Sequence, residues 1–207
     1  YFCMHRIFLA LVLPLFLAAC GAESVWAPDE LVARNIYSHP GPTTLTLITM
    51  KNTSSDNGAH TALMINASQR VLWDPAGSFK HPTIPERNDL IFGITPRVLD
   101  YYISYHSRET YYTVIQELQV PAEVAEMALR ETMAYGAVGE ARCTVSTSEI
   151  LKRLPGFENI GVTFFPNELE KQFAKFPGIA RIEYHEDDAD DKSVAAAQID
   201  ALIRAGL

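Results

Sequence analysis

The stretch that decides the fold is residues 60–74, which read HTALMINASQRVLWD. Residues 60–65 are apolar on both faces, which is typical of a strand that is covered on two sides. Residues 70–74 form a second short apolar run, and the polar residues between the two runs indicate a turn. We therefore expect two adjacent strands that pair as a hairpin.

The rest of the chain predicts one α+β domain over residues 43–207, in which a small antiparallel sheet packs against helices. β-branched and apolar runs indicate strands at 43–50, 111–120 and 179–184. Helical spacing, with proline near the start and glycine at the end where present, indicates helices at 96–106, 121–136, 143–154, 167–176 and 193–207. Residues 20–42, rich in proline, are expected to be a tether, and residues 75–89 a loop.

Composition excludes several classes of protein. The 207 residues are 48% hydrophobic and 20% charged, which excludes a disordered chain. The formal net charge of −8 and the lack of a basic run argue against a nucleic-acid partner. No G-x-S-x-G, Walker or Rossmann motif occurs, and the histidines lack the spacing of a metal site. We therefore expect no cofactor and no metal.

The first 19 residues are predicted to be a signal peptide. A short basic region, His5-Arg6, precedes an apolar stretch over residues 7–19 that is too short to span a bilayer comfortably. The sequence at 17–20, LAAC, resembles the lipobox of bacterial lipoproteins. This resemblance implies that Cys20 is lipidated and begins the mature chain in the bacterial cell envelope. With Ala22 and not Asp two residues after it, the resemblance implies the outer membrane facing the periplasm. The alternative is an ordinary signal in which the cysteine is accidental.

Cys143 is the candidate nucleophile. Of the three cysteines, Cys3 precedes the first methionine and Cys20 would carry lipid, which leaves Cys143 without a partner for an internal disulfide. It stands where a helix is expected to begin, and the free N–H groups of a helix N-terminus favour the thiolate. Two alternatives are open. Ser146 and Glu149 match a capping box, which would start the helix three residues later, and the thiol could be an inert buried side chain.

A thiol nucleophile needs a base, and the base needs an orienting acceptor. His60 is the candidate base because it begins a strand, whereas His106 lies on the apolar side of a helix and is expected to be a core histidine. A hairpin centred on Ala67 would place His60 directly opposite Asp74, since the residue numbers of each pair would sum to 134. A two-residue turn would make this sum 135 and send Asp74 to the other face of the sheet. Asp74 before a proline could equally be a turn former.

The order His, Asp, Cys resembles the permuted papain-like superfamily, which includes NlpC-type and YiiX-like thiol hydrolases and relatives of lecithin retinol acyltransferase. The segments that carry the likeness are GAHTALMI, RVLWDPAG, ARCTVSTSEILKRL and TFFPNELEKQF. The resemblance implies a cysteine hydrolase or acyltransferase that acts on an amide or ester bond. Cys143 would attack, His60 would transfer protons and Asp74 would orient the imidazole. Peptide stems of the cell wall are the first expectation for the substrate, and lipid-like esters or amides are the second. Arg142, where relatives often have a small or polar residue, is a departure.

The alternative function is a non-catalytic envelope lipoprotein that binds a protein or glycan partner on the same scaffold. Five tyrosines gather within a dozen residues, and such side chains suit carbohydrate or protein contacts when they are exposed together: Tyr101, Tyr102, Tyr105, Tyr111 and Tyr112. The simpler expectation is that they pack a helix onto the sheet.

Overall fold

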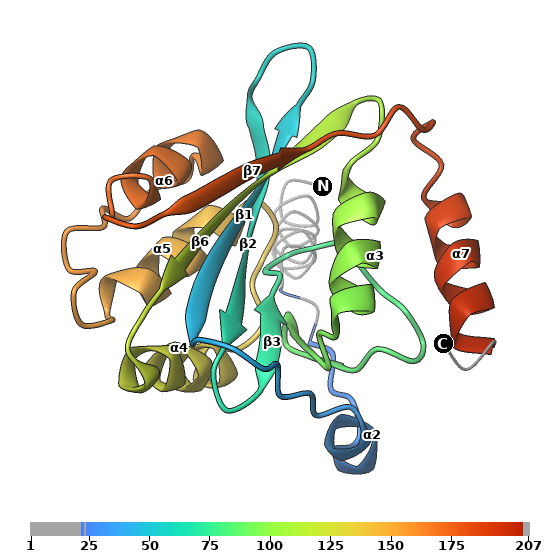
Figure 1. The fold of residues 1–207 in the computed structure, drawn as a ribbon, viewed down its shortest axis with the longest axis horizontal. Helices are drawn as coiled ribbons and strands as arrows, with labels where there is room; N and C mark the ends of the chain where they lie inside the picture. Colours follow the sequence, from blue (N-terminus) through green and yellow to red (C-terminus); the bar gives the residue numbers. More distant parts are fainter. Residues whose placement is uncertain (1–21, 23, 205–207) are drawn as a thin grey trace, which may run out of the picture.

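Over the described part of the chain, the fold is an antiparallel sheet of seven strands with six helices packed against it (Figure 1). The structure is a computed structural model, and it describes residue 22 and residues 24–204. The strands lie in the order β4-β5-β3-β2-β1-β6-β7, with bounds β1 Thr44–Asn52, β2 Gly58–Asn66, β3 Arg70–Trp73, β4 Glu86–Arg87, β5 Leu90–Phe92, β6 Tyr111–Gln119 and β7 Ala180–Tyr184. The helices are α2 Asp29–Arg34, α3 Pro96–His106, α4 Ala122–Tyr135, α5 Cys143–Lys152, α6 Pro166–Phe173 and α7 Lys192–Arg204.

The α+β class expected from the sequence is confirmed, and each predicted strand and helix has a counterpart within a few residues. Three elements were not predicted. β4 and β5 are two and three residues long, too short to show periodicity, and α2 is a helix of six residues within the predicted tether.

The β2–β3 hairpin has neither of the two registers considered from the sequence. Met64 pairs with Leu72 and Ile65 with Val71, so the numbers of each pair sum to 136, not 134. The reason is the turn, which is centred on Ser68 and closed by the Ala67 N–H donating to the Gln69 carbonyl. Because side chains alternate with a period of two, this even shift leaves Asp74 on the same face as His60.

The sheet is covered on both faces, as expected for the apolar run in β2. Leu63 and Ile65 belong to a large core that the sheet forms with α4, α5 and α6, and Ala62 and Met64 belong to a second core with α3 and α7. Leu63, Ile65 and Ala62 are completely buried. Two-sided packing therefore holds β2, the strand that carries His60, on a rigid support.

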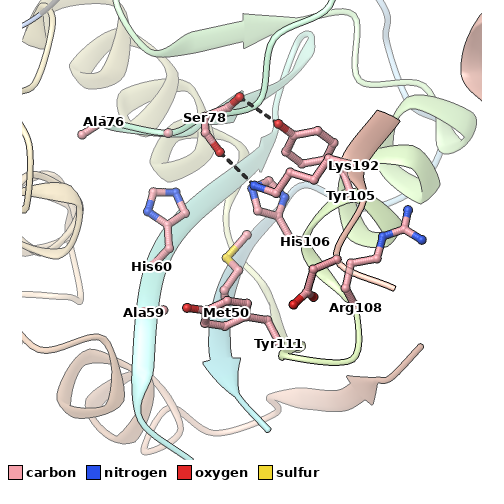
Figure 2. A pocket seen from close by; sticks show the side chains of 12 residues that line it. Met50, Ala59, His60, Ala76, Ser78, Tyr105, His106, Arg108, Tyr111 and Lys192 are labelled. Carbon is pink, nitrogen blue, oxygen red and sulfur yellow. Dashed lines mark hydrogen bonds between the residues drawn. The ribbon is translucent and has the colours of Figure 1, made fainter. Parts of the chain in front are cut away.

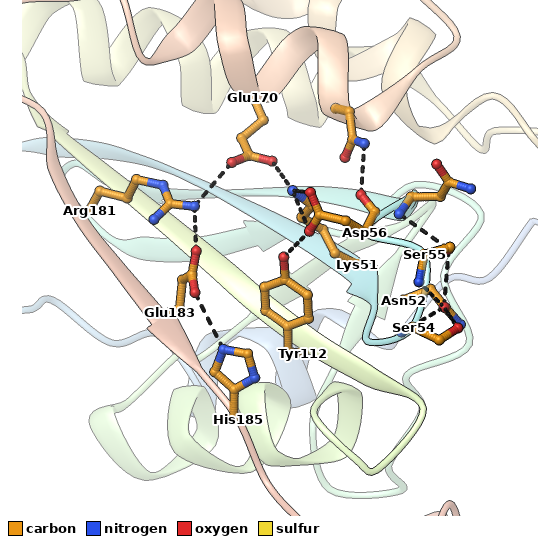
Figure 3. A network of polar contacts seen from close by, with 12 residues as sticks. Lys51, Asn52, Ser54, Ser55, Asp56, Tyr112, Glu170, Arg181, Glu183 and His185 are labelled. Carbon is orange, nitrogen blue, oxygen red and sulfur yellow. Dashed lines mark hydrogen bonds and ion pairs between the residues drawn. The ribbon is translucent and has the colours of Figure 1, made fainter.

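An ionic network joins α6 to the sheet at the β1–β2 end (Figure 3). Lys51 of β1 is almost fully buried and lies 3.4 Å from Glu170 of α6 and 3.1 Å from Asp56 in the β1–β2 turn. Glu170 in turn accepts from Arg181 of β7. The network explains how a buried lysine is tolerated, because two carboxylates face it.

The segment predicted to be a tether is hydrogen-bonded to the sheet at two places, at the edge strand β4 and at the start of β3. The Asn88 N–H donates to the Val25 carbonyl, and the Ala27 N–H to the Glu86 carbonyl. Farther along, the Tyr37 carbonyl accepts from the N–H of Arg70. The predicted signal peptide and Cys20 lie outside the described residues. Among the residues that are described, no helix is long and apolar enough to cross a membrane.

The two-sided core predicts a large effect of truncation in β2. Leu63→Ala is expected to lower the free energy of unfolding by about 2–5 kcal/mol, because it leaves a cavity in a closed core. Urea unfolding followed by circular dichroism measures this. The control is Ile182→Ala on β7, where the side chain is 61% exposed, and this change is expected to stay within about 0.5 kcal/mol of the wild type. Equal losses for the two variants would contradict the placement of β2.

Candidate active site

Cys143 is the first residue of α5. Arg142 is the N-cap, and the first intrahelical hydrogen bond runs from the Ser146 N–H to the Arg142 carbonyl. Ser146 does not cap the helix, because its hydroxyl donates to the Cys143 carbonyl; the capping-box alternative is therefore wrong. The thiol consequently lies in the turn whose N–H groups an α-helix leaves without intrahelical partners.

The start of α5 is held against β2 next to His60. The hydroxyls of Thr144 and Thr61 lie 3.1 Å apart, and both residues are completely buried. The Thr61 backbone also contributes to lowering the pKa of the Cys143 thiol. These contacts fix the thiol beside the strand position that precedes Thr61, which is His60.

His60 lies between the thiol and Asp74. Its Nε2 is 2.7 Å from Asp74 Oδ1, and the Cys143 thiol is near enough that His60 and the thiol each shift the pKa of the other. The structure thus brings together all three residues that the sequence singled out. Asp74 reaches His60 diagonally across the hairpin and not from the directly opposite position, as the corrected register requires.

Tyr102 is a fourth member of the site, and the sequence indicated it only as one of five clustered tyrosines that either pack a helix onto the sheet or contact a partner. Its hydroxyl donates to Asp74 Oδ1 over 2.6 Å, and its side chain is completely buried in α3. The helical spacing over residues 96–106 predicts the helix, but nothing in that pattern indicates which acceptor the Tyr102 hydroxyl meets. Asp74 is thereby held by donors from two elements, β2 and α3.

Gly77 leaves the space that the Asp74 carboxyl occupies. A Cβ at position 77 would lie 1.9 Å from Asp74 Oδ2 and 2.4 Å from its Cγ, much closer than any stable contact. The Gly77 N–H also donates to the Asp74 carbonyl over 3.0 Å. The turn after β3 therefore needs glycine here because of close approach.

The electrostatics of the site favour a thiolate beside an imidazolium. Burial opposes charge on His60, but the Asp74 carboxylate and the thiol outweigh it and raise the His60 pKa to about 10. Burial likewise opposes the Cys143 thiolate, but His60 outweighs it and lowers the thiol pKa. The pKa of Asp74 is lowered as well, because His60 and the Tyr102 hydroxyl outweigh its burial. The three groups therefore stabilise one another in the charged state.

A cavity of about 390 Å³ borders the site on the His60 side (Figure 2). Charged and hydroxyl groups of Ser78, Arg108, Asp190 and Lys192 line it together with apolar atoms such as those of Met50. Cys143 does not line this cavity, and its side chain is 9% exposed.

His106 also lines the cavity, and its ring stacks on that of His60 with the centroids 6.2 Å apart. Burial lowers its pKa to about 4, so it is neutral at neutral pH. Its Nδ1 is 2.8 Å from the Tyr102 carbonyl and must carry the proton there, which makes Nε2 an acceptor. His106 is therefore not only a core histidine, as expected from the sequence, because it also borders the cavity.

The other histidines lie in separate places. His39 contacts Tyr37, His81 contacts Asp200 and Thr83, and His185 stacks on Tyr112. Within residues 22 and 24–204, no group of three or more His, Cys, Asp or Glu side chains is arranged to hold a metal ion.

No protein-family model matches this chain, and neither a curated protein nor a solved structure is similar enough to count as a match.

The close approach at Gly77 predicts that Gly77→Ala displaces the Asp74 carboxyl and weakens its hold on His60. The apparent pKa of Cys143, read from its alkylation rate against pH, is then expected to rise. Each unit of this rise lowers the thiolate population below the pKa about tenfold. Gly161→Ala is the control, since a Cβ there would meet only Gln172 at 3.4 Å or more. An unchanged alkylation profile in Gly77→Ala would contradict the role assigned to the Asp74–His60 contact.

Proposed function

We propose that this protein is a cysteine hydrolase or acyltransferase that acts on an amide or ester bond. The observation that carries the proposal is the continuous chain of contacts from the Cys143 thiol through His60 to Asp74 and Tyr102, with the thiol at a helix N-terminus. A merely structural cysteine needs none of these partners, whereas a nucleophile needs a base and an orienter.

In the proposed reaction the Cys143 thiolate attacks the carbonyl carbon of the substrate and forms a C–S bond. The His60 imidazolium donates its proton to the leaving nitrogen or oxygen, the scissile bond breaks, and a thioester remains on Cys143. Water, or an alcohol or amine in a transferase, then gives a proton to His60 and attacks the thioester. The C–S bond breaks, the acyl product leaves, and the thiolate and imidazolium are restored.

The oxyanion of the tetrahedral intermediate would form near the start of α5. The N–H groups of residues 143–145 precede the first intrahelical hydrogen bond and point out of the helix end. Donors of this kind stabilise negative charge that develops in a transition state. Asp74, held by Tyr102, would keep the imidazole in the orientation and tautomer that the transfers require.

We also propose that the fold is a permuted papain-like one and that the chain is a bacterial lipoprotein. The first is supported by the chain order of the site, in which the histidine strand comes first, the carboxylate follows directly after the next strand and the cysteine comes later at a helix start. The second rests on the lipobox-like sequence at 17–20, and it places the protein in the cell envelope, attached through Cys20.

Peptide stems of the cell wall are the substrate that the cavity favours over a lipid. Arg108, Asp190 and Lys192 bring charges of both signs to its wall, and Ser78 adds a hydroxyl. A peptide offers charged ends and amides that can bond to such groups. An aliphatic chain would displace the water that solvates them and provide no hydrogen bonds in its place.

One observation favours the alternative of a non-catalytic binding lipoprotein. The thiol is largely covered, and the cavity opens beside His60 and not at the sulfur itself. A scaffold that binds a peptide without cleaving it would tolerate this arrangement. The two experiments below separate the alternatives.

The reactivity of the thiol tests for a nucleophile. In the mature chain with Cys20→Ser, the rate of iodoacetamide alkylation should rise with pH through an apparent pKa well below the free value of about 8.5, because His60 stabilises the thiolate. His60→Ala is expected to move this pKa upward. His185→Ala is the control, because that histidine is exposed and contacts Glu183 and Tyr112 instead. A slow reaction with an unshifted pKa would indicate an inert cysteine.

Release of peptides from purified cell wall tests the substrate. The same soluble form is expected to release peptides, and Cys143→Ala is expected to reduce the rate at least about 10³-fold, as loss of a nucleophile does in related chemistry. Equal release by Cys143→Ala would remove the catalytic claim. No release by the wild type, in a preparation whose thiol pKa is lowered, would contradict the peptide substrate alone.

A further inference from the structure

A patch of exposed apolar side chains surrounds the docked N-terminal segment. Trp26 is 63% exposed, Ile36 55% and Met133 47%, and all three line one cavity of about 210 Å³. Its floor includes Leu90 and Phe92, which are buried in the main core. We refer to Trp26, Ile36 and Met133 as the Trp26 patch. Large apolar side chains gathered in this way mark a surface that contacts something other than water.

The backbone around Trp26 is attached to the domain and does not hang free. Val25 and Ala27, on either side of it, both hydrogen-bond β4 or its flank. The Arg87 guanidinium lies over the Trp26 ring, 4.7 Å from the centroid, and also donates to the Ala27 carbonyl. The ring is therefore held outward on a fixed support, beside a cation.

The length of chain before this support limits where a lipid on Cys20 can lie. Trp26 is the sixth residue after Cys20, and a chain spans at most about 3.5 Å per residue, or roughly 20 Å in total. Ala22, two residues after Cys20, lines a cavity together with Val25 and Glu86. Acyl chains on Cys20 would thus enter the bilayer close to this edge of the domain.

We propose that the Trp26 patch docks on the phospholipid bilayer in which Cys20 is anchored. The proposal rests on the lipid attachment put forward above. Tryptophan is favoured at the membrane–water interface because its ring is apolar and its N–H remains polar. The Arg87 guanidinium beside it is paired with the Asp29 carboxylate, so the ring and the apolar side chains, and not a free cation, would make the contact. Ile36 and Met133 supply apolar area on the same side. The bound domain would then meet the membrane through a defined face.

A second exposed apolar group serves as a comparison. Phe164 and Phe165 are 60% and 70% exposed in the loop before α6. This loop leads to Asn167, whose side-chain amide donates to the Asp56 carbonyl in the β1–β2 turn. The Trp26 patch lines its cavity together with Gln69, which lies in the β2–β3 turn at the other end of β2. Figure 1 shows the same separation between α6 and α2. A flat bilayer at the Trp26 patch therefore leaves these phenylalanines in water.

The test uses residues 20–207 with Cys20→Ser, which contain every described strand and helix, and vesicles of phosphatidylethanolamine and phosphatidylglycerol. Of the two tryptophans, Trp73 is completely buried, so the change in emission reports on Trp26. Docking predicts a blue shift of the emission and protection from acrylamide when vesicles are added. Flotation should show a loss of vesicle binding of about tenfold or more in Ile36→Ser, which keeps the fluorophore, and in Trp26→Ser.

The matched control is Phe165→Ser, which removes an equally exposed ring from the other end of the molecule and should bind vesicles as the parent does. Cys143→Ala should also bind unchanged, so that failure of the proposed catalysis and failure of docking give different results. The proposal is overturned if the parent does not bind vesicles, if Trp26 emission does not shift, or if Phe165→Ser weakens binding as much as Ile36→Ser.

Discussion

The buried carboxylate of Asp74 is the constraint on which the site depends. A carboxylate in the interior is tolerated only when charged or hydrogen-bonding partners surround it, and Asp74 has the His60 ring and the Tyr102 hydroxyl on one oxygen. These partners come from β2 and α3, while Gly77 leaves room for the second oxygen. The turn after β3, the start of β2 and the inner face of α3 are thus tied together by one negative charge. The position of the His60 ring beside Cys143 follows from these contacts of Asp74.

The two histidines beside the cavity carry opposite protonation states for reasons that are visible in their contacts. Asp74 and the thiol keep His60 charged, whereas His106, stacked on it, meets a backbone carbonyl and is neutral. Environments that push the pKa values of neighbouring groups apart are a common way to divide acid and base roles. In the proposed reaction His60 transfers the protons, and the neutral His106 presents an acceptor nitrogen to whatever occupies the cavity. This division requires no residue beyond the described constellation.

The proposed anchor and the proposed site are connected through the same edge of the sheet. The N-terminal segment hydrogen-bonds around β4, and Ala22 lines a cavity that also includes Gly77, the residue packed on Asp74. A domain attached in this way cannot rotate freely at the end of a long tether. The surface that carries Trp26 would thus set how the active-site cavity is presented to the periplasm. Under these two proposals, membrane attachment and substrate access would be parts of one arrangement.

The sequence by itself determined the α+β class, the main strands and helices, and the candidacy of Cys143, His60 and Asp74. Apolar periodicity and residue chemistry are local, and both can be read along the chain. Tertiary structure decided the rest. The β2–β3 register depends on a turn one residue farther along, β4 and β5 are too short to show a pattern, and the acceptor for Tyr102 lies 28 residues away. Backbone hydrogen bonds at β4 hold the segment that was predicted to be a tether. The sequence could not predict them, because every residue except proline carries the same backbone donor and acceptor.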